Sequence, residues 1–298
     1  MKQQTDWELG MIQSTRNLAA LVFLVLTSGA CSTPSTNVVT SSDGVRIAYE
    51  VHGQGEPVLV FIHGWCCDRS HWNEQVPYFS REHAVVTIDL AGHGESGRNR
   101  AEWTMGAFGA DVAAVIDTLD LRRVILIGSS MGGSVMLEAA LQMPKRVIGL
   151  VSVDALANPD TTFSIEENLS LLQTDFEATM EKVARSLLNP AADSALVQRV
   201  AASLAACPPE VALPTTVTSF EYYNQGQCKR ALRRITVPIR GIHSQFPLNK
   251  NAFRPYTQSI EAVTLADAGH LSMLEKPDEF NRILAKYVDE IGNMPAFR

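Results

Sequence analysis

The sequence has few charged residues and no concentration of positive charge. Asp, Glu, Lys and Arg make up 19% of the 298 residues, and the formal net charge is −7. Nucleic-acid binding needs Lys and Arg clustered on one face, and no basic stripe runs through this chain. We therefore expect no nucleic-acid partner. Apolar segments recur regularly along the chain, which argues against disorder.

Cysteine is scarce, and the sequence contains neither a metal-ligand spacing nor a phosphate-binding glycine loop, so we expect no metal site. Five cysteines in a chain of this length make disulfides optional. Cys207 and Cys228 lie in one polar helical stretch and could pair in an oxidising compartment. Cys66 and Cys67 are expected to be small buried groups, because a bridge between adjacent residues strains the disulfide.

The N-terminus contains a short apolar run rather than the roughly 20 residues that a membrane-spanning helix needs. Residues 18–26 are apolar, follow Arg16, and precede three small residues and Cys31. This pattern predicts a secretory signal over 1–30, with a buried or membrane-associated helix as the alternative. The position of Cys31 resembles a bacterial lipoprotein signal. That resemblance implies a lipidated Cys31, a tether over 31–37, and a periplasmic or membrane-anchored protein.

Short apolar, β-branched runs recur through the chain and predict a mostly parallel sheet covered by helices on both faces. The predicted strands are an alternating edge strand at 45–51 and buried strands at 58–62, 84–90, 124–127, 147–153 and 237–242. Apolar residues at helical spacing predict helices over 105–119 and 277–291. The alternation of strand and helix indicates a doubly wound α/β fold, whose ligand sites gather at the carboxyl ends of the strands.

One region breaks this alternation. Between residues 155 and 232 the sequence contains only helical patterns, with prolines at 208, 209 and 214. This predicts a helical cap inserted into an α/β core formed by 38–154 and 233–298. Seven apolar cap residues could face a pocket, although packing within the cap explains them equally well: Phe163, Leu169, Leu172, Phe176, Phe220, Tyr222 and Tyr223.

The strongest chemical signal is Gly-x-Ser-x-Gly around Ser130, between a predicted strand and a predicted helix. Gly128 and Gly132 allow a tight turn that a Cβ would obstruct, and this turn thrusts the serine hydroxyl out of the sheet. The helix N-terminus presents backbone N–H groups, including that of Met131, to a developing oxyanion. A serine in an ordinary strand-to-helix turn is the alternative interpretation.

Two further segments complete the predicted site. The loop that follows the strand at 58–62 can aim the backbone N–H of Trp65 at the same point as that of Met131, which gives an oxyanion hole with two donors. We expect His63 in this loop to stabilise it rather than act as a base. His270 lies between the last apolar segment and the last helix, and it is our candidate base for Ser130, with His243 second.

These motifs together resemble the α/β-hydrolase superfamily over almost the whole chain from 38 to 291. The matching segments are the His-Gly-Trp at 63–65, the stretch 89–96, the Gly-x-Ser-x-Gly at 128–132, Gly269-His270 and the Glu-Lys-Pro at 275–277. The resemblance implies a mostly parallel eight-stranded sheet, a Ser-His-acid triad, no cofactor and often a helical cap. It also implies that 89–96 is a structural turn.

The acid of the triad departs from the pattern of many relatives. The loop at 243–251, where they carry an aspartate, contains no carboxylate. Asp154 ends the preceding strand at the same edge of the sheet, and some relatives place the acid there, so we assign Asp154. The alternatives are a dyad assisted by Asn249 or Gln245, or a purely structural Asp154 that caps a helix.

The predicted function is that of a serine hydrolase that cleaves a carboxylic ester through an acyl-enzyme, with a small, ester-like apolar molecule as its substrate. Lactonase, C–C hydrolase, perhydrolase and acyltransferase activities would use the same Ser130 and His270. A ligand-binding surface lipoprotein without catalysis is the alternative from a different class. The sequence indicates neither the substrate nor the oligomeric state.

Overall fold

The computed structural model describes residues 36–244, 247–257 and 259–295. The predicted signal segment 1–30, Cys31 and most of the proposed tether lie outside these residues, as does Gln245. Among the described residues, no helix combines the length and the apolar character needed to cross a bilayer.

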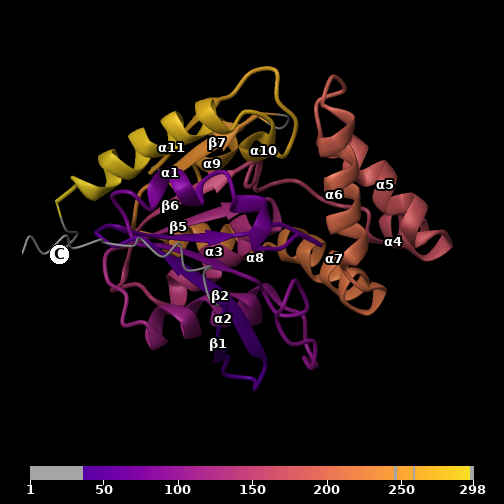
Figure 1. Ribbon diagram of the computed structural model, residues 1–298, viewed down its shortest axis with the longest axis horizontal. Helices are drawn as coiled ribbons and strands as arrows, with labels where there is room; N and C mark the ends of the chain where they lie inside the picture. Colours follow the sequence, from indigo (N-terminus) through magenta and orange to yellow (C-terminus); the bar gives the residue numbers. More distant parts are fainter. Residues whose placement is uncertain (1–35, 245–246, 258, 296–298) are drawn as a thin grey trace, which may run out of the picture. The chain divides into compact units, whose positions relative to one another are not determined.

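Eight strands form a single sheet (Figure 1). They are β1 (Asn37–Thr40), β2 (Arg46–His52), β3 (Val58–Ile62), β4 (Val85–Ile88), β5 (Val124–Ser129), β6 (Val147–Val153), β7 (Ile239–His243) and β8 (Ile260–Thr264). Their spatial order is β1-β2-β4-β3-β5-β6-β7-β8. The first two pairings, β1 with β2 and β2 with β4, are antiparallel, and all the others are parallel. The predicted fold class is therefore confirmed.

Each predicted buried strand coincides with an observed strand to within two residues at both ends, whereas the predicted edge strand is not at the edge. β2 lies between β4 and the short strand β1, which pairs with it from Asn37↔Tyr49 to Thr40↔Arg46. β1 escaped prediction because its four residues are mostly exposed and carry too short a pattern to indicate a strand.

Helices cover both faces of the sheet. One face carries α1 (Val76–Phe79) and α11 (Pro277–Gly292), and the other carries α2 (Met105–Thr118) and α3 (Met131–Gln142) (Figure 1). Short helical turns lie at Arg69–Trp72 (η1), Lys250–Phe253 (α9) and Ser272–Glu275 (α10).

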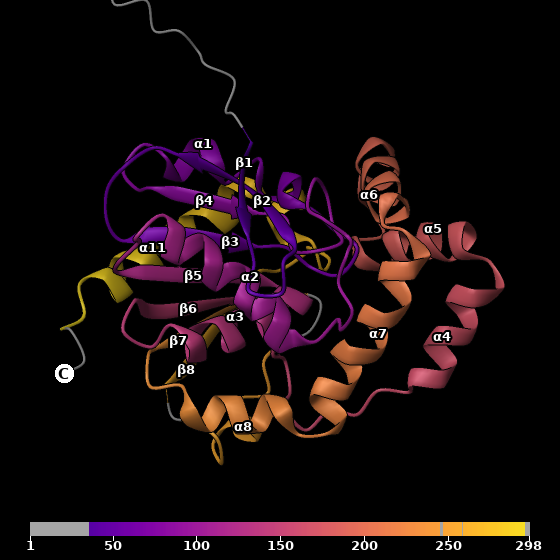
Figure 2. The same cartoon turned by 90° about the horizontal axis from the view of Figure 1, so that it is seen from below.

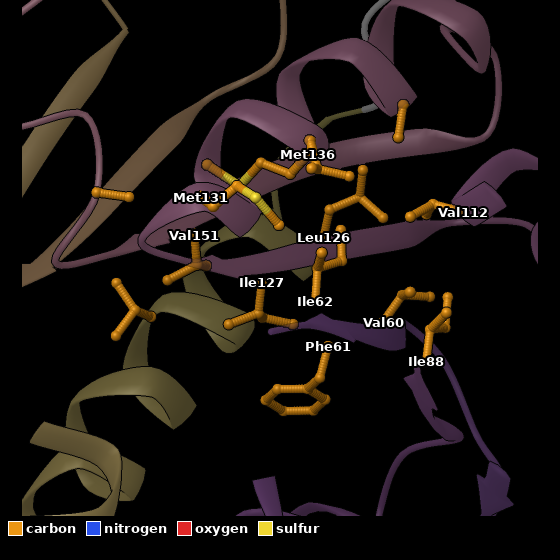
Figure 3. Close-up of a cluster of buried hydrophobic side chains, with 14 of the residues drawn as sticks. Val60, Phe61, Ile62, Ile88, Val112, Leu126, Ile127, Met131, Met136 and Val151 are labelled. Atoms are coloured by element: carbon orange, nitrogen blue, oxygen red, sulfur yellow. The ribbon is translucent and has the colours of Figure 1, made fainter. Parts of the chain in front are cut away.

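The core lies where the central strands meet these helices. Every residue of β3 is buried, and so is every residue of β5. Side chains alternate between the two faces: Phe61 contacts Trp72, with ring centroids 4.9 Å apart, and points away from the side of the sheet on which Met136 lies (Figure 3). Burial on both faces explains why these strands are continuously apolar rather than alternating.

Five helices lie between β6 and β7 and form the cap (Figure 2). They are α4 (Ile165–Thr174), α5 (Phe176–Leu187), α6 (Ser194–Ala206), α7 (Pro209–Asn224) and α8 (Gln227–Arg234). α5 packs on α6, α4 packs on α7, and α8 returns to contact α3 in the core. Pro214 lies inside α7 rather than ending it, and the hydroxyl groups of Thr215 and Thr216 donate to backbone carbonyls one turn earlier.

Candidate active site

Ser130 stands at the strained turn between β5 and α3. Its backbone has φ 53° and ψ −118°, a conformation that costs free energy in a residue with a side chain. A Cβ on Gly128 would lie 2.3 Å from the carbonyl oxygen of Gly132, and a Cβ on Gly132 would lie 2.6 Å from the carbonyl oxygens of Ile62 and His63. Only glycine fits at either position, so the strained turn is a property of the backbone packing.

The loop after β3 lies directly against this turn. A Cβ on Gly64 would lie 3.2 Å from the Cβ of Ser130, so the neighbouring Trp65 is held close to the serine. The indole N–H of Trp65 donates to the carbonyl oxygen of Ala212 in α7, at 3.1 Å, and thereby ties the loop to the cap. Met131 begins α3, where a helix has backbone N–H groups without helical acceptors.

Backbone hydrogen bonds align the ends of three neighbouring strands at this edge of the sheet. The N–H of Ser130 donates to the carbonyl oxygen of Val153 at 3.0 Å, and the N–H of Asp154 donates to that of Ile242 at 2.9 Å. Asp154 therefore follows β6 directly beside the turn that carries Ser130. Its backbone also has a positive φ, 42°, and its side chain is buried.

Ser244 connects Asp154 to the segment that carries His270. The N–H of Ser244 donates to one carboxylate oxygen of Asp154 at 2.7 Å. The hydroxyl of Ser244 lies within hydrogen-bonding distance of the other carboxylate oxygen and of the carbonyl oxygen of Gly269. The acid and the loop that ends in His270 are thus held by one small side chain.

Glu275 holds the same loop from the other side. Its carboxylate accepts the N–H of Gly269 at 2.6 Å and the N–H of Asn189, just after α5, at 2.7 Å. A Cβ on Gly269 would lie 2.6 Å from the carbonyl oxygen of Leu187, so the loop before His270 packs tightly under the cap. Glu275 therefore fixes both the His270 segment and the end of a cap helix.

These segments surround one cavity of about 500 Å³ between the core and the cap. Ser130, Asp154 and His270 all line it, together with Trp65 and Met131. The five side-chain and backbone positions predicted to carry the chemistry come from four separate stretches of chain, and the fold brings all of them to the same cavity.

His270 is almost fully buried at this cavity. Burial, and to a lesser extent the neighbouring His243, lowers the pKa of His270 from its usual value of 6.5 to about 4. The imidazole is therefore neutral near pH 7. A neutral imidazole is the form that can accept a proton from a serine hydroxyl.

His63, which lies near the same edge of the sheet, occupies a structural position. His63 Nδ1 lies 2.8 Å from the carbonyl oxygen of Gly64, and its Nε2 accepts the N–H of Leu90 at 3.0 Å. Burial lowers the pKa of His63 to about 3, so the ring bridges two loops as a neutral group, in agreement with the role expected for it. His243 ends β7 and does not line the cavity.

The alternative partners for His270 are placed differently. The side chain of Asn249 caps α9 by accepting the N–H of Ala252, and Asn249 does not line the cavity. Sequence reasoning missed the contacts of Ser244 and Glu275. Glu275 stands in a matching family segment, which was a signal, whereas nothing in the sequence marks Ser244.

The segment 89–96 forms a turn held by its own polar groups. The carboxylate of Asp89 accepts the N–H groups of Arg69 and Glu95 and pairs with the Arg69 guanidinium, and the Ser96 hydroxyl donates to the Asp89 carbonyl. A Cβ on Gly94 would collide with the Asp89 carboxylate at 2.3 Å. This is the structural turn that the family resemblance implied.

An aromatic cluster lines the cap side of the cavity. The rings of Phe163 and Phe220 stack with centroids 4.5 Å apart, and Tyr223 meets Phe163 edge-on at 5.4 Å. Asn224 fixes the backbone of Phe163 by accepting its N–H at 2.8 Å and donating to its carbonyl at 2.9 Å. Leu171, which is 58% exposed, also lines the cavity.

The cavity separates the seven cap residues that the sequence left undecided. Phe163, Leu172, Phe220 and Tyr223 line it. Leu169, Phe176 and Tyr222 do not, and Tyr222 instead donates its buried hydroxyl to Glu138 of α3 at 2.8 Å.

The described residues contain no group of three or more His, Cys, Asp or Glu side chains arranged to hold a metal ion. The four cysteines in this part of the chain are free and buried. Cys207 has Cys66 as a neighbour, whereas Cys228 has Tyr223 and Glu138. Cys207 and Cys228, the two cysteines that the sequence suggested could pair, therefore have different neighbours.

The chain belongs to the alpha/beta hydrolase family, whose model matches residues 59–283. It is therefore an enzyme of the α/β-hydrolase type.

Similar proteins include different activities on this fold. The chain is 26% identical over 260 residues to the dihydrolipoyllysine-residue acetyltransferase component of the acetoin cleaving system of Cupriavidus necator; the aligned region covers 83% of this chain and 67% of that protein. It is 40% identical over 122 residues to a non-heme chloroperoxidase of Streptomyces lividans, and this alignment covers 40% of this chain and 44% of the relative. Among solved structures, an esterase from Exiguobacterium antarcticum superposes with a TM-score of 0.75 at 18% identity, over 86% of this chain and all of that one.

Proposed function

We propose that the protein is a serine hydrolase that cleaves a neutral, apolar carboxylic ester through an acyl-enzyme. One observation carries the proposal: a serine on a strained turn, a buried carboxylate and a buried neutral imidazole line the same cavity. Such a convergence of nucleophile, base and acid is the arrangement that acyl transfer requires.

In this mechanism the hydroxyl of Ser130 attacks the ester carbonyl while His270 takes its proton. The backbone N–H groups of Trp65 and Met131 stabilise the oxyanion of the tetrahedral intermediate. His270 then gives the proton to the leaving alcohol, and water hydrolyses the acyl-enzyme by the same steps. Asp154 orients the imidazole and stabilises its protonated form.

The cavity supports an uncharged substrate. Among the described residues that line it, Tyr223 is the only ionisable side chain besides Asp154 and His270, and most of the lining surface is apolar although Ser, Thr and Asn side chains also contribute. An anionic substrate would find no cation among these residues to replace its hydration. An acyl or alcohol group of moderate size can instead bury its apolar surface against Phe163 and Phe220.

Labelling with a fluorophosphonate probe, together with hydrolysis of p-nitrophenyl esters of graded acyl length, tests the proposal. Wild-type protein should react at Ser130 and turn over the esters. Ser130→Ala should lose labelling and at least about 1,000-fold in kcat while it keeps the wild-type melting temperature. If a folded Ser130→Ala variant still turned over the esters, this result would contradict the proposal.

A second candidate is transfer of the acyl group to an acceptor other than water. The names of the acetyltransferase component and the chloroperoxidase favour it, because an acyl-enzyme can also be attacked by a thiol, an alcohol or hydrogen peroxide. Product analysis with each acceptor present distinguishes this from hydrolysis: acyl transfer gives the acylated acceptor and hydrolysis gives the free acid. A non-catalytic binding protein would give neither product and no probe labelling.

We also propose that the chain is exported and anchored through a lipid on Cys31. The support is the apolar run at 18–26 followed by small residues and Cys31. Metabolic labelling with palmitate in a bacterial host should mark the wild-type chain and not Cys31→Ala. Unlabelled protein that stays in the cytoplasm would contradict both parts of this proposal.

A further inference from the structure

Two cap helices that line the cavity are each joined by hydrogen bonds to a loop of the proposed active site. α7 supplies Thr216, Ser219, Phe220 and Tyr223 to the lining, and α5 supplies Thr179 and Val183. We call the loop 63–67 after β3 the oxyanion loop, and the loop 265–271 between β8 and α10 the base loop. The cap therefore contacts the catalytic groups through specific hydrogen bonds as well as through the cavity.

The indole of Trp65 joins the oxyanion loop to α7. Its Nε1–H donates to the carbonyl oxygen of Ala212 at 3.1 Å. The same carbonyl oxygen accepts the hydroxyl of Thr216 at 2.8 Å, and Thr216, one turn later in α7, lines the cavity. The backbone N–H of Trp65 is the oxyanion donor of the proposed mechanism. Since one residue carries both N–H groups, a shift of α7 would also move the oxyanion donor.

The carboxylate of Glu275 joins the base loop to the end of α5. One oxygen, Oε1, accepts the N–H of Asn189 at 2.7 Å, and the other, Oε2, accepts the N–H of Gly269 at 2.6 Å. Gly269 directly precedes His270, and a Cβ on Gly269 would lie 2.6 Å from the backbone nitrogen of Asn189. The base loop and the end of α5 are therefore in direct contact, so a displacement of α5 would disturb the loop that carries the base.

Leu171 of α4 presents apolar surface at the cavity. It lines the cavity and is 58% exposed, whereas the adjacent Leu172 is 6% exposed. α4 packs on α7, which lies on the core side of it (Figure 2). An acyl group that covers Leu171 would bury apolar surface against α4 and, through α4, hold α7 in place. From α7 the effect would reach the oxyanion loop through the indole of Trp65.

We propose that the indole of Trp65 and the carboxylate of Glu275 are positioning groups that couple occupancy of the cap to the chemical step. An acyl group that packs against α4, α5 and α7 fixes these helices, and the two side chains then hold the oxyanion donor and His270 in their reactive positions. The inference rests on the ester hydrolysis proposed above, and it specifies the substrate as an ester whose acyl chain fills the cap.

The coupling predicts that a longer acyl chain increases the rate of acylation and not only the affinity. Binding energy that is used to fix catalytic groups appears in the rate constant, whereas contact with a passive apolar pocket lowers KM alone. Single-turnover release of p-nitrophenol, with the protein in excess, measures acylation for two esters that share a leaving group, the acetate and the octanoate. In the wild type, the saturating rate should be about 10-fold higher for the octanoate than for the acetate.

Two variants remove the coupling groups and leave the reacting groups in place. Trp65→Phe removes the indole donor but keeps an aromatic ring and the backbone N–H. Glu275→Gln leaves a single oxygen for two N–H donors. Each variant should lower the octanoate-to-acetate ratio of acylation rates about 5-fold, with little change in the apparent affinity for the octanoate.

Matched variants control for the loss of an indole or a carboxylate elsewhere. Trp72→Phe removes an indole N–H that has no acceptor among the described residues. Glu279→Gln neutralises an exposed carboxylate in the first turn of α11. Both variants should keep the wild-type ratio. Melting temperatures identify a coupling variant that folds poorly, and the other coupling variant then tests the same prediction at its own loop.

The outcomes separate this inference from the function on which it rests. A ratio near one in the wild type, or an equal loss for both esters in Trp65→Phe and Glu275→Gln, would overturn the coupling and leave ester hydrolysis standing. If the wild type released no p-nitrophenol and reacted with no fluorophosphonate, the proposed function would be wrong, and the coupling with it.

Discussion

The carboxyl edge of the sheet, where β5, β6 and β7 end, and the cap contribute to the same cavity by different physical means. At the edge, glycines, strained backbone and hydrogen bonds between neighbouring strands hold Ser130, Asp154 and the His270 loop in place. In the cap, Phe163 and Phe220 present apolar surface, and one polar clamp, Asn224, fixes the first of them. In the proposed function, the carboxyl edge of the sheet therefore supplies the reacting groups, whereas the cap supplies apolar surface for the substrate.

The largest expected effect is on the acid at the edge. Asp154→Asn keeps the shape of the side chain but removes the charge that, in the proposed mechanism, stabilises protonated His270, so kcat for a p-nitrophenyl ester should fall by about 10,000-fold. Asn249→Ala is the matched control, because Asn249 caps α9 away from the cavity, and it should leave kcat unchanged. A normal rate in Asp154→Asn would show that another residue serves as the acid of the triad.

Substitution of glycine in the turn tests whether close backbone packing determines the conformation of the turn that carries Ser130. Gly128→Ala places a Cβ 2.3 Å from the carbonyl oxygen of Gly132 and should lower the free energy of unfolding by about 3 kcal/mol. Gly106→Ala, in α2, meets no atom closer than 3.9 Å and should leave stability unchanged or raise it by about 0.5 kcal/mol. Urea titration of both variants measures the difference, and equal stabilities would show that the turn tolerates a side chain.

The pH dependence of kcat/KM tests the environment of His270. In the proposed mechanism the neutral imidazole is the active form, so activity should be present above its pKa and lost as pH falls through that value. Because burial lowers the pKa to about 4, the acid limb should lie near pH 4 rather than near the usual 6.5. A midpoint at or above 6.5 would mean that attraction to Asp154 outweighs burial.

Substitution of Ser244 tests whether the positions of Asp154 and the His270 loop depend on the Ser244 hydroxyl. Ser244→Ala removes the hydroxyl that lies between Asp154 and the carbonyl of Gly269, while the backbone N–H still donates to Asp154. We expect kcat to fall by roughly 10- to 100-fold with KM nearly unchanged, since this change affects positioning rather than substrate contact. Ser244→Thr, which keeps a hydroxyl, should recover part of the loss; equal loss in both variants would contradict the positioning role.

The smallest expected effect is in the cap. Asn224→Ala releases the backbone of Phe163. Because we expect only the longer acyl groups to contact the aromatic cluster, KM should rise several-fold for long-chain p-nitrophenyl esters and change little for the acetate. Gln225→Ala, at the next position, is the control. A uniform loss for all chain lengths would mean that Phe163 supports the fold rather than selects the substrate.

The difference between the two regions also explains what the sequence could reveal. The positions of Ser130 and His270 relative to strands and helices were predictable because glycine spacing and β-branched runs determine backbone geometry. The cap residues that line the cavity were not predictable, because an apolar residue at helical spacing packs equally well inside the cap or against a cavity. Phe220 lines the cavity, whereas Tyr222, two residues later, is buried against α3. Ser244 acts through a contact between distant strands that no local pattern encodes.

The insertion of the cap between β6 and β7 has a consequence for how the protein folds. β6 can pair with β7, from Leu150↔Ile239 to Val153↔Ile242, only after the whole cap segment has been looped out, which makes this one of the most sequence-distant contacts in the sheet. The hydrogen bond from Ser244 to Asp154 spans the same gap. Asp154 can therefore acquire these partners only when both halves of the core, on either side of the cap segment, have met.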